Sequence, residues 1–367
     1  MEAFNYQFTA LRGIQAGREY YVVMCPLKLI PKIFLFDEEE IPAELRAQRV
    51  LNRARVPEIA RYMLSNPNEY VFSSITASID GEVRFEPREP RGAERNVGTL
   101  TVPMTARFLI NDGQHRRAAI EEALKASPHM GDETVSVVFF VDAGLERSQQ
   151  MFADLNKHAV RPTKSIGILY DKRDPLAQAA YTLSQRVPVF RGLTEIEKTT
   201  ISNRSPKLFT LSAIYQATHA LLQLNRGVVI PKPDQALAYD FWAALGETIP
   251  EWRLIINRQV SAAQLRSEYV HAHGVALHAI GIAGHSLVID YPEDWRSRLA
   301  PLAELNWLRT NREWEGRAMY HGKMSKAGLS VNLTANLIKQ AMGLKLSAEE
   351  ATLEQEVKPT TKARSVG

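Results

Sequence analysis

The sequence predicts a fold that mixes helices and strands, of the α/β (α+β) class. A domain built on one mixed sheet is followed by a mostly helical region. Over the first 160 residues, short segments with the period of strands alternate with segments that have the period of amphipathic helices. After about residue 162 the strand patterns fade and helical spacing prevails. We therefore expect an α/β domain over residues 1–160, a mostly helical domain over 161–346, and a flexible polar tail over 347–367.

The strands and helices of the first part follow from local patterns of apolar residues, proline and glycine. The pair Asp80-Gly81 interrupts an alternating segment and predicts a β-hairpin over residues 69–87. Pro57 stands where a first-turn proline is tolerated in a helix. The expected strands are 18–25, 32–36, 106–111 and 134–142, and the expected helices are 42–54, 56–66, 114–126 and 145–159.

The second part contains segments whose apolar residues recur every three or four positions, as they do on the buried face of a helix. One of these segments holds His271, His273, His278 and His285 together with Gly274, Gly281 and Gly284. No acid stands between the histidines, so the glycines indicate close helix packing and no metal site is expected. The expected helices are 174–187, 208–224, 234–249 and 265–287.

Composition excludes several classes of protein. The chain has 367 residues, a net charge of +4 and a pI near 9.0, which is compatible with nucleic-acid binding. The single cysteine, Cys25, excludes an intrachain disulfide and a cysteine zinc site. The N-terminus lacks the pattern of a signal peptide, and no window of the sequence has the apolar length of a membrane span. We therefore expect a cytoplasmic protein without membrane contact.

Residues 112–117, Asp-Gly-Gln-His-Arg-Arg, place two permanent positive charges in the first turn of a predicted helix. The helix dipole disfavours cations at this end, so Arg116 and Arg117 conflict with the local preference. A bound phosphate would remove the conflict, because the arginines and the free N–H groups of the turn would bind it together. Gly113 would allow close approach of a ligand, and Asp112 would cap the helix. The segment therefore predicts a phosphate or nucleotide site made by Asp112, Gly113, Gln114, His115, Arg116 and Arg117.

A purely structural role explains the same residues. Either arginine could be exposed or could pair with Glu121 at helical spacing, and Asp112-Gly113 could be only a turn. If the anion site exists, replacing Arg116 and Arg117 by alanine should weaken the binding of DNA or nucleotide without unfolding the protein.

Several blocks of the sequence resemble one known family. The Asp-Gly-Gln-His-Arg segment after a strand is the motif of the DGQHR proteins, which resemble the ParB/sulfiredoxin superfamily. Four blocks in order resemble DndB, the regulatory protein encoded beside the enzymes of DNA phosphorothioate modification. These blocks are REYYVVMCPLKLIPKIF, QRVLNRARVPEIARYML, VPMTARFLINDGQHRRAAIEEAL and MFADLNKHAVRPTKSIGILYDKRDPLA.

The resemblance implies a ParB-like sheet domain and a transcriptional repressor that binds double-stranded promoter DNA of the modification genes. In that superfamily a turn of this kind holds phosphate or nucleotide, which here would be ATP or CTP. The alternative is a nucleotide triphosphatase of the sulfur-modification system, which would need a positioned acid and usually Mg²⁺. Asp112 and Asp154 are the candidate acids. A homo-oligomer is compatible with either function.

The segment 154–165 is the candidate for a second phosphate-binding wall, since a ParB-like fold could return it to the motif. Its donors are Asn156, Lys157, His158, Arg161 and Lys164, although cations also suit the end of a helix without any ligand. Sulfiredoxins use a cysteine beside their arginine, but Gln114 occupies that position here. Cys25 is therefore expected to be buried and inert, with a redox role as the alternative.

Positive charge is concentrated in residues 161–210, which contain nine Lys or Arg and four Asp or Glu. This surplus predicts contact with the DNA backbone through the polar segment 194–209. The candidate residues there are Lys198, Arg204 and Lys207. No clear helix-turn-helix is present, and the helix expected at 329–344 is a second candidate. It would read DNA through Asn332, Asn336, Lys339 and Gln340, unless these residues form a solvated face.

Overall fold

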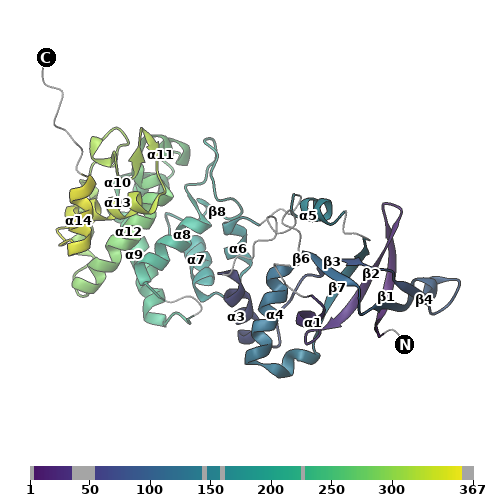
Figure 1. Ribbon diagram of the computed structural model, residues 1–367. Helices are drawn as coiled ribbons and strands as arrows, with labels where there is room; N and C mark the ends of the chain where they lie inside the picture. The colour runs from purple at the N-terminus through teal and green to yellow at the C-terminus, as the bar shows by residue number, and fades with distance from the viewer. Residues whose placement is uncertain (1–3, 35–53, 143–146, 158–161, 225–227, 358–367) are drawn as a thin grey trace, which may run out of the picture. The chain divides into compact units, whose positions relative to one another are not determined.

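The computed structural model describes residues 4–34, 54–142, 147–157, 162–224 and 228–357 (Figure 1). The chain divides into two compact units, Met1–Val160 and Arg161–Gly367. The first unit is built on a mixed sheet and the second is mostly helical, so the predicted α/β class is confirmed. Among the described residues, no helix has the length and apolarity needed to cross a bilayer.

A seven-stranded sheet forms the centre of the first unit, with the strand order β4-β5-β1-β2-β7-β3-β6. Neighbouring strands are antiparallel except β3 and β7, which are parallel. Ala16 and Gly17 join β1 to β2 with φ values of 51° and 73°, as a two-residue hairpin turn requires. The strands are β1 Asn5–Gln15, β2 Arg18–Pro26, β3 Ile75–Asp80, β4 Arg84–Pro87, β5 Val97–Pro103, β6 Arg107–Asp112 and β7 Thr134–Val141.

Helices pack against this sheet. Buried apolar residues of α1, α3 and α4 share one core with alternate residues of the strands, such as Val137 and Phe139 of β7. Successive side chains of a strand point to opposite faces, so Asn111 of β6 faces away from that core, toward the start of α5. The helices are α1 Ile30–Ile33, α3 Arg55–Ser65, α4 Gln114–Ala126 and α5 Ser148–Lys157, with 3₁₀ turns at Ala93–Asn96 and Pro128–Asp132.

Two sequence predictions for this unit are wrong. The segment around Asp80-Gly81 is no hairpin, because β3 pairs with β6 and β7 whereas β4 pairs with β5. The apolar strand β3 is buried inside the sheet, and the Asp80 carboxylate accepts a hydrogen bond from Arg107 Nε of β6 (3.0 Å). The helix Ile30–Ile33 overlaps the start of the strand expected at 32–36, of which residues 35 and 36 lie outside the described chain. The helix expected at 42–54 lies almost entirely outside the described residues.

The second unit consists of helices joined by loops and short two-stranded pairings. The helices are α6 Lys164–Tyr170, α7 Pro175–Arg186, α8 Leu211–Leu222, α9 Lys232–Thr248, α10 Pro250–Ile256, α11 Ala262–Glu268, α12 Gly274–Asp290, α13 Gly328–Ala341 and α14 Ala348–Val357. The short strands are β8 Thr194–Glu195, β9 Phe209–Thr210, β10 Met319–Tyr320 and β11 Lys323–Met324, and 3₁₀ turns lie at Val270–Ala272, Ser297–Ala303 and Arg312–Trp314.

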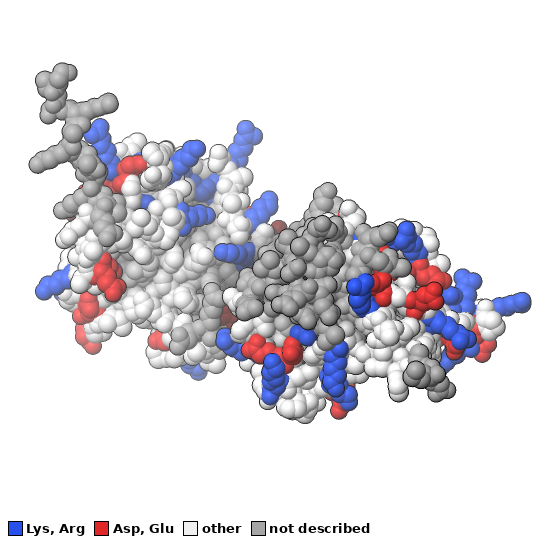
Figure 2. All heavy atoms as spheres, in the orientation of Figure 1, with Lys and Arg blue, Asp and Glu red and all other residues white. Residues whose placement is uncertain are grey.

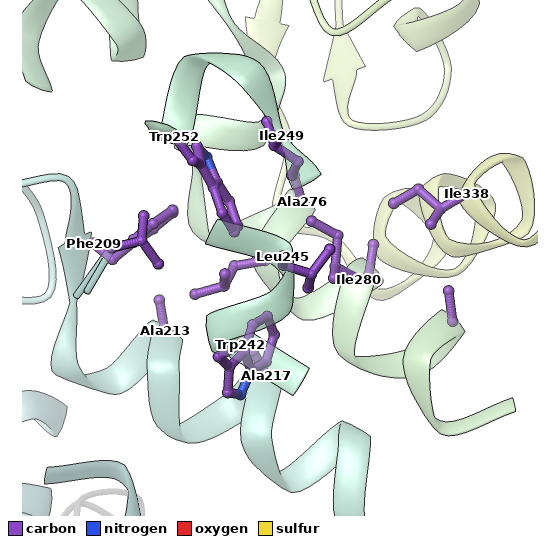
Figure 3. Close-up of a cluster of buried hydrophobic side chains, with 14 of the residues drawn as sticks. Phe209, Ala213, Ala217, Trp242, Leu245, Ile249, Trp252, Ala276, Ile280 and Ile338 are labelled. Carbon is purple, nitrogen blue, oxygen red and sulfur yellow. The ribbon is translucent and has the colours of Figure 1, made fainter. Parts of the chain in front are cut away.

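Helix α12 runs through the core of this unit and contacts both α8 and α13. Figure 3 shows its Ala276 and Ile280 in the same cluster as Ala213 and Ala217 of α8. A Cβ added at Gly281 would lie only 2.2 Å from the carbonyl oxygen of Ala217. The close helix packing that the glycines predicted is therefore confirmed.

The segment expected to be a flexible tail contains helix α14, which packs against α13. The buried ammonium group of Lys339 on α13 pairs with the Glu350 carboxylate of α14 (2.6 Å). Arg317 adds a two-pronged ion pair with Glu354, with both N–O distances 2.6 Å. These contacts order the segment as far as Val357, and residues 358–367 lie outside the described chain.

Candidate functional site

The turn between β6 and α4 contains the predicted phosphate motif. Gly113 adopts φ 111°, and a Cβ at this position would lie 3.0 Å from Arg116 Nη2 and 3.1 Å from Ile75 Cγ1. The close approach that Gly113 permits is therefore made by the protein's own side chains. The expectation that Asp112 caps the helix is wrong, because no side chain caps α4.

Arg116 folds back over this turn. Its guanidinium donates to Asp112 Oδ2 (2.7 Å), to Ser73 Oγ (2.6 Å) and to the carbonyl oxygen of Ser74 (3.1 Å). Its Nε is buried and has no acceptor among the described residues. The side chain that was predicted to bind phosphate thus joins the start of α4 to the chain segment that leads into β3. One of the two candidate acids for a hydrolase, Asp112, is engaged in this pairing, and the other, Asp154, accepts a hydrogen bond from Gln150 (2.7 Å).

Arg117 points to the interior of the unit. Its Nε donates to the carbonyl oxygen of Phe34 (3.0 Å) and its Nη2 to that of Pro31 (3.2 Å). Its Nη1 pairs with the Glu121 carboxylate one helical turn later. The structure therefore has the pairing with Glu121 that the sequence offered as the structural alternative, and this guanidinium holds α1 against α4.

Gln114 and His115 are half-buried on the same turn. Burial lowers the pKa of His115, and the positive charges of Arg55 and Arg116 lower that pKa further. Arg55 is the first residue of α3 and is exposed, and sequence reasoning did not select it. The available signal was its place in the block RARVPEIARYML, one of the family-like blocks. Arg55 is therefore the exposed residue at this turn, whereas Gln114, His115 and Arg116 are half-buried and Arg117 is buried.

The predicted second wall lies mostly beyond what the structure describes. Asn156 and Lys157 end α5, but their side chains are outside the described part, as are His158 and Arg161. The start of α5 is anchored beside the motif strand, because Ser148 Oγ donates to Asn111 Oδ1 (2.6 Å). Lys164 begins α6 in the second unit. The second phosphate wall remains a prediction.

Cys25 lies on β2 with its side chain in the core of the first unit. It is fully buried, and burial raises the pKa of its thiol to about 12. A thiol in this environment is protonated at neutral pH and does not act as a nucleophile. The geometry favours the inert cysteine over the redox alternative.

The histidines of the helical unit take separate roles. Trp252 Nε1 donates to His271 Nδ1 (3.0 Å), which leaves His271 Nε2 to donate to Glu251 Oε2 (3.2 Å). His273 Nε2 donates to the carbonyl oxygen of Arg266 (2.8 Å), and a ring nitrogen of His285 contacts the carbonyl oxygen of Leu221 (2.8 Å). Among the described residues, no His, Cys, Asp or Glu side chains gather in a group that could hold a metal ion.

Acidification should destabilise the helical unit through His273. Burial lowers the pKa of His273 to about 4, whereas an unfolded histidine titrates near 6.5. The unfolded state therefore takes up a proton between these pH values and the native state does not. Stability present above pH 6.5 should fall by up to about 1.4 kcal/mol per pH unit down to pH 4. Urea unfolding at pH 7 and pH 5 measures this loss of stability. The loss should be smaller in His273→Gln than in the parent, and it should be unchanged in the control His321→Gln, because His321 is exposed. Equal losses in parent and His273→Gln would contradict the assignment.

A family model described as DndB, DNA-sulfur modification-associated, matches residues 8–345. The chain belongs to the DndB family. No curated protein and no solved structure matches it. Membership associates this DndB-family chain with DNA sulfur modification, and the predicted recognition is confirmed over nearly the whole chain.

In this DndB-family protein, the basic segment 161–210 lies in the helical unit, where Figure 2 shows blue side chains gathered over the part labelled α6, β8 and α11 in Figure 1. Lys198 and Arg204 are exposed and form no ion pair within the described residues. Lys207 is half-buried, and its Nζ donates to the carbonyl oxygen of Gly192 (2.9 Å). Two of the three predicted DNA-binding cations are thus available to a phosphate.

Three acids of this segment accept hydrogen bonds from backbone N–H groups. Asp171 accepts from the backbone N–H of Arg173 (3.0 Å), and Glu195 accepts from those of Glu197 (3.0 Å) and Lys198 (3.2 Å). Asp174 caps α7 by accepting from the N–H of Leu176 (2.8 Å). These carboxylates keep their negative charge, but within the described residues none of them forms an ion pair with Lys198 or Arg204.

The second candidate for DNA reading, α13, presents few of its polar residues. Asn336 is buried and donates to the carbonyl oxygen of Glu350 (3.2 Å), and Lys339 is buried against the same residue. Asn332 and Gln340 are exposed. The interpretation of α13 as a reading helix therefore loses two of its four residues to packing against α14.

Proposed function

We propose that this DndB-family protein is a DNA-binding transcriptional regulator that represses the genes of DNA phosphorothioate modification. The observation that carries the proposal is the set of exposed cations without a carboxylate partner in the basic segment, Lys164, Arg191, Lys198 and Arg204. Exposed, unpaired Lys and Arg side chains are the groups that neutralise DNA phosphates. Family membership supplies the link to the sulfur-modification system.

Two of these cations are held next to each other by a backbone contact. Ser165 Oγ, beside Lys164 at the start of α6, donates to the carbonyl oxygen of Lys198 (2.8 Å). Thr163 Oγ1 also donates to the carbonyl oxygen of Glu197. The lysines therefore project from two chain segments that are tied together, which suits contact with successive phosphates of one DNA backbone.

DNA affinity should fall steeply with salt, and the basic segment should carry much of this dependence. If three or four cations contact phosphates, the log–log slope of affinity against salt should be roughly −3 to −4 per protomer, since each contact contributes about −0.9. Replacing Lys198 and Arg204 together by alanine should make the slope shallower by about 2 units. The loss should be similar on promoter and random duplexes, because phosphate contacts carry no sequence information. DNA affinity and its salt slope can be measured by fluorescence anisotropy over a salt series.

The matched control replaces the exposed cations Arg253 and Lys345, which lie outside the basic segment, by alanine. This control should keep the slope of the parent. Equal slopes in the parent and the Lys198→Ala, Arg204→Ala variant would move the DNA-binding surface elsewhere. Absence of binding to the modification-gene promoter at low salt would remove the proposed function.

A further inference from the structure

A polar cavity of about 450 Å³ lies within the helical unit. It adjoins a second cavity of about 410 Å³, and the two share Thr199, Thr200 and Lys326 in their walls. Cavities of this volume are typical of sites for small ligands. Phe209 and Ala213, labelled in Figure 3, form part of the apolar side of the larger cavity.

The charge of the cavity walls has one sign. Lys164, Arg266, Arg309 and Lys326 line the two cavities, and no Asp or Glu is among the described residues that do so. The guanidinium of Arg266 is buried, and its acceptors are the carbonyl oxygens of residues 202–207, which have no net charge. Several positive charges therefore face a partly enclosed space without a counter-charge.

The hydrogen bonds of Arg309 are the clearest indication of a ligand site. Its Nη1 makes two long hydrogen bonds, to the carbonyl oxygens of Arg266 (3.4 Å) and Ser267 (3.3 Å). Its Nε is buried without an acceptor, and it has no carboxylate partner in the described part of the chain. Buried polar and charged groups are normally paired. Arg116 also has an unpaired Nε, but Asp112 balances its charge, whereas Arg309 has no such partner, and its unmade donor therefore points to an anionic ligand.

The uncapped start of α12 adds partial positive charge at the same place, whereas Thr210 caps the neighbouring start of α8. Gly274 begins α12, and a Cβ there would lie 3.1 Å from the Cβ of Ala213, so the first turns of α12 and α8 are adjacent. No side chain caps α12, which leaves the N–H groups of its first turn available. Helix starts of this kind bind phosphate groups.

We propose that the cavity binds a small phosphorylated ligand, whose phosphate lies among Arg309, Lys326 and the first turn of α12. Thr199 and Thr200, which line both cavities, supply hydroxyl donors to the same group. The site goes beyond the proposed DNA-binding function. It shares Lys164 with the set of cations proposed to contact DNA, but it does not use Lys198 or Arg204. Its proposed phosphate contacts are Arg309, Lys326 and the first turn of α12. Failure of one proposal therefore leaves the other standing.

Calorimetric titration of the full chain with inorganic phosphate, ATP and CTP tests the cavity. We expect at least one of these probes to bind the parent. Arg309→Ala should weaken this binding at least tenfold, because the unpaired guanidinium would no longer contact the phosphate. Lys326→Glu should weaken it by at least as much, and since Lys326 is exposed this change does not threaten the fold.

The matched controls are Arg312→Ala and Lys323→Ala, which remove neighbouring exposed cations that do not line the cavities. They should keep the parent affinity within twofold. The proposal would be overturned if none of the probes bound, or if the parent and Lys326→Glu bound them equally. It would also be overturned if a short DNA duplex, added as a further probe, were the only ligand whose affinity depended on Arg309 and Lys326.

Discussion

Gly281→Ala should strongly destabilise the helical unit, although alanine favours helices more than glycine does. The added Cβ would lie 2.2 Å from the carbonyl oxygen of Ala217, a backbone atom that cannot rotate away. Helices α8 and α12 would have to separate in the middle of the core that contains Ala217 and Ile280. We expect a loss of about 3 kcal/mol or more in the free energy of unfolding, at the upper end of overpacking effects. Urea denaturation followed by circular dichroism measures this loss.

Gly167→Ala is the matched control, because Gly167 also lies inside a helix, α6, but has no atom within 4 Å of the added Cβ. This change should be neutral or should stabilise the protein by up to about 1 kcal/mol, the difference in helix propensity. If both alanine variants had the same stability, the close contact between α8 and α12 would be incorrect.

Arg117→Ala should destabilise the first unit by about 2–4 kcal/mol, because carbonyl oxygens and a carboxylate would lose a charged donor. The carbonyl oxygens of Phe34 and Pro31 depend on this guanidinium, as does Glu121. The sequence alone predicted that Arg117 could be removed without unfolding, and the buried position of its side chain reverses that expectation. The measurement is the free energy of unfolding of the first unit, from chemical denaturation in which the unfolding of each unit is followed separately.

Lys125→Ala on the same helix serves as the control. Lys125 is exposed, and its Nζ lies 3.9 Å from Glu121 Oε1, which is a long distance for an ion pair. Lys125→Ala should change stability by less than about 0.5 kcal/mol. Arg117→Lys should recover only part of the loss, because an ammonium group cannot reach the two carbonyl oxygens and Glu121 at once. Full stability in Arg117→Ala would show that this side chain is not a structural contact.

Most of the predicted helices are present because their signals are local, but the single helix expected at 265–287 is wrong: the structure has α11, a 3₁₀ turn at Val270–Ala272 and α12 there. The helix expected at 114–126 has those bounds in the structure, where it is α4. Strand pairing depends on distant partners, and so the hairpin at Asp80-Gly81 was wrong. The long strand β1 was also not predicted, although it pairs with β2 through the local turn at Ala16 and Gly17. The local alternation around Asp80 is real, but it contains no information about whether β6 or β4 will pair with β3.

The site was predictable only in part, for a related reason. The sequence shows that Arg116 and Arg117 begin a helix, but not that both guanidinium groups turn back to contact carbonyl oxygens. The cavity of the helical unit draws on residues from Thr163 to Val331, which only the tertiary fold brings together. None of its cations stands in a recognisable motif, so spacing alone could not identify it.

The way Arg266 holds the loop before β9 has a consequence for how this protein can evolve. The guanidinium binds the main-chain oxygens of Ser202 (2.9 Å), Asn203 (3.1 Å) and Ser205 (3.0 Å) and not their side chains. Every amino acid offers the same oxygen, so the loop can exchange side chains while its path stays fixed. New contact chemistry can therefore arise there by single substitutions, with the shape of the loop inherited unchanged.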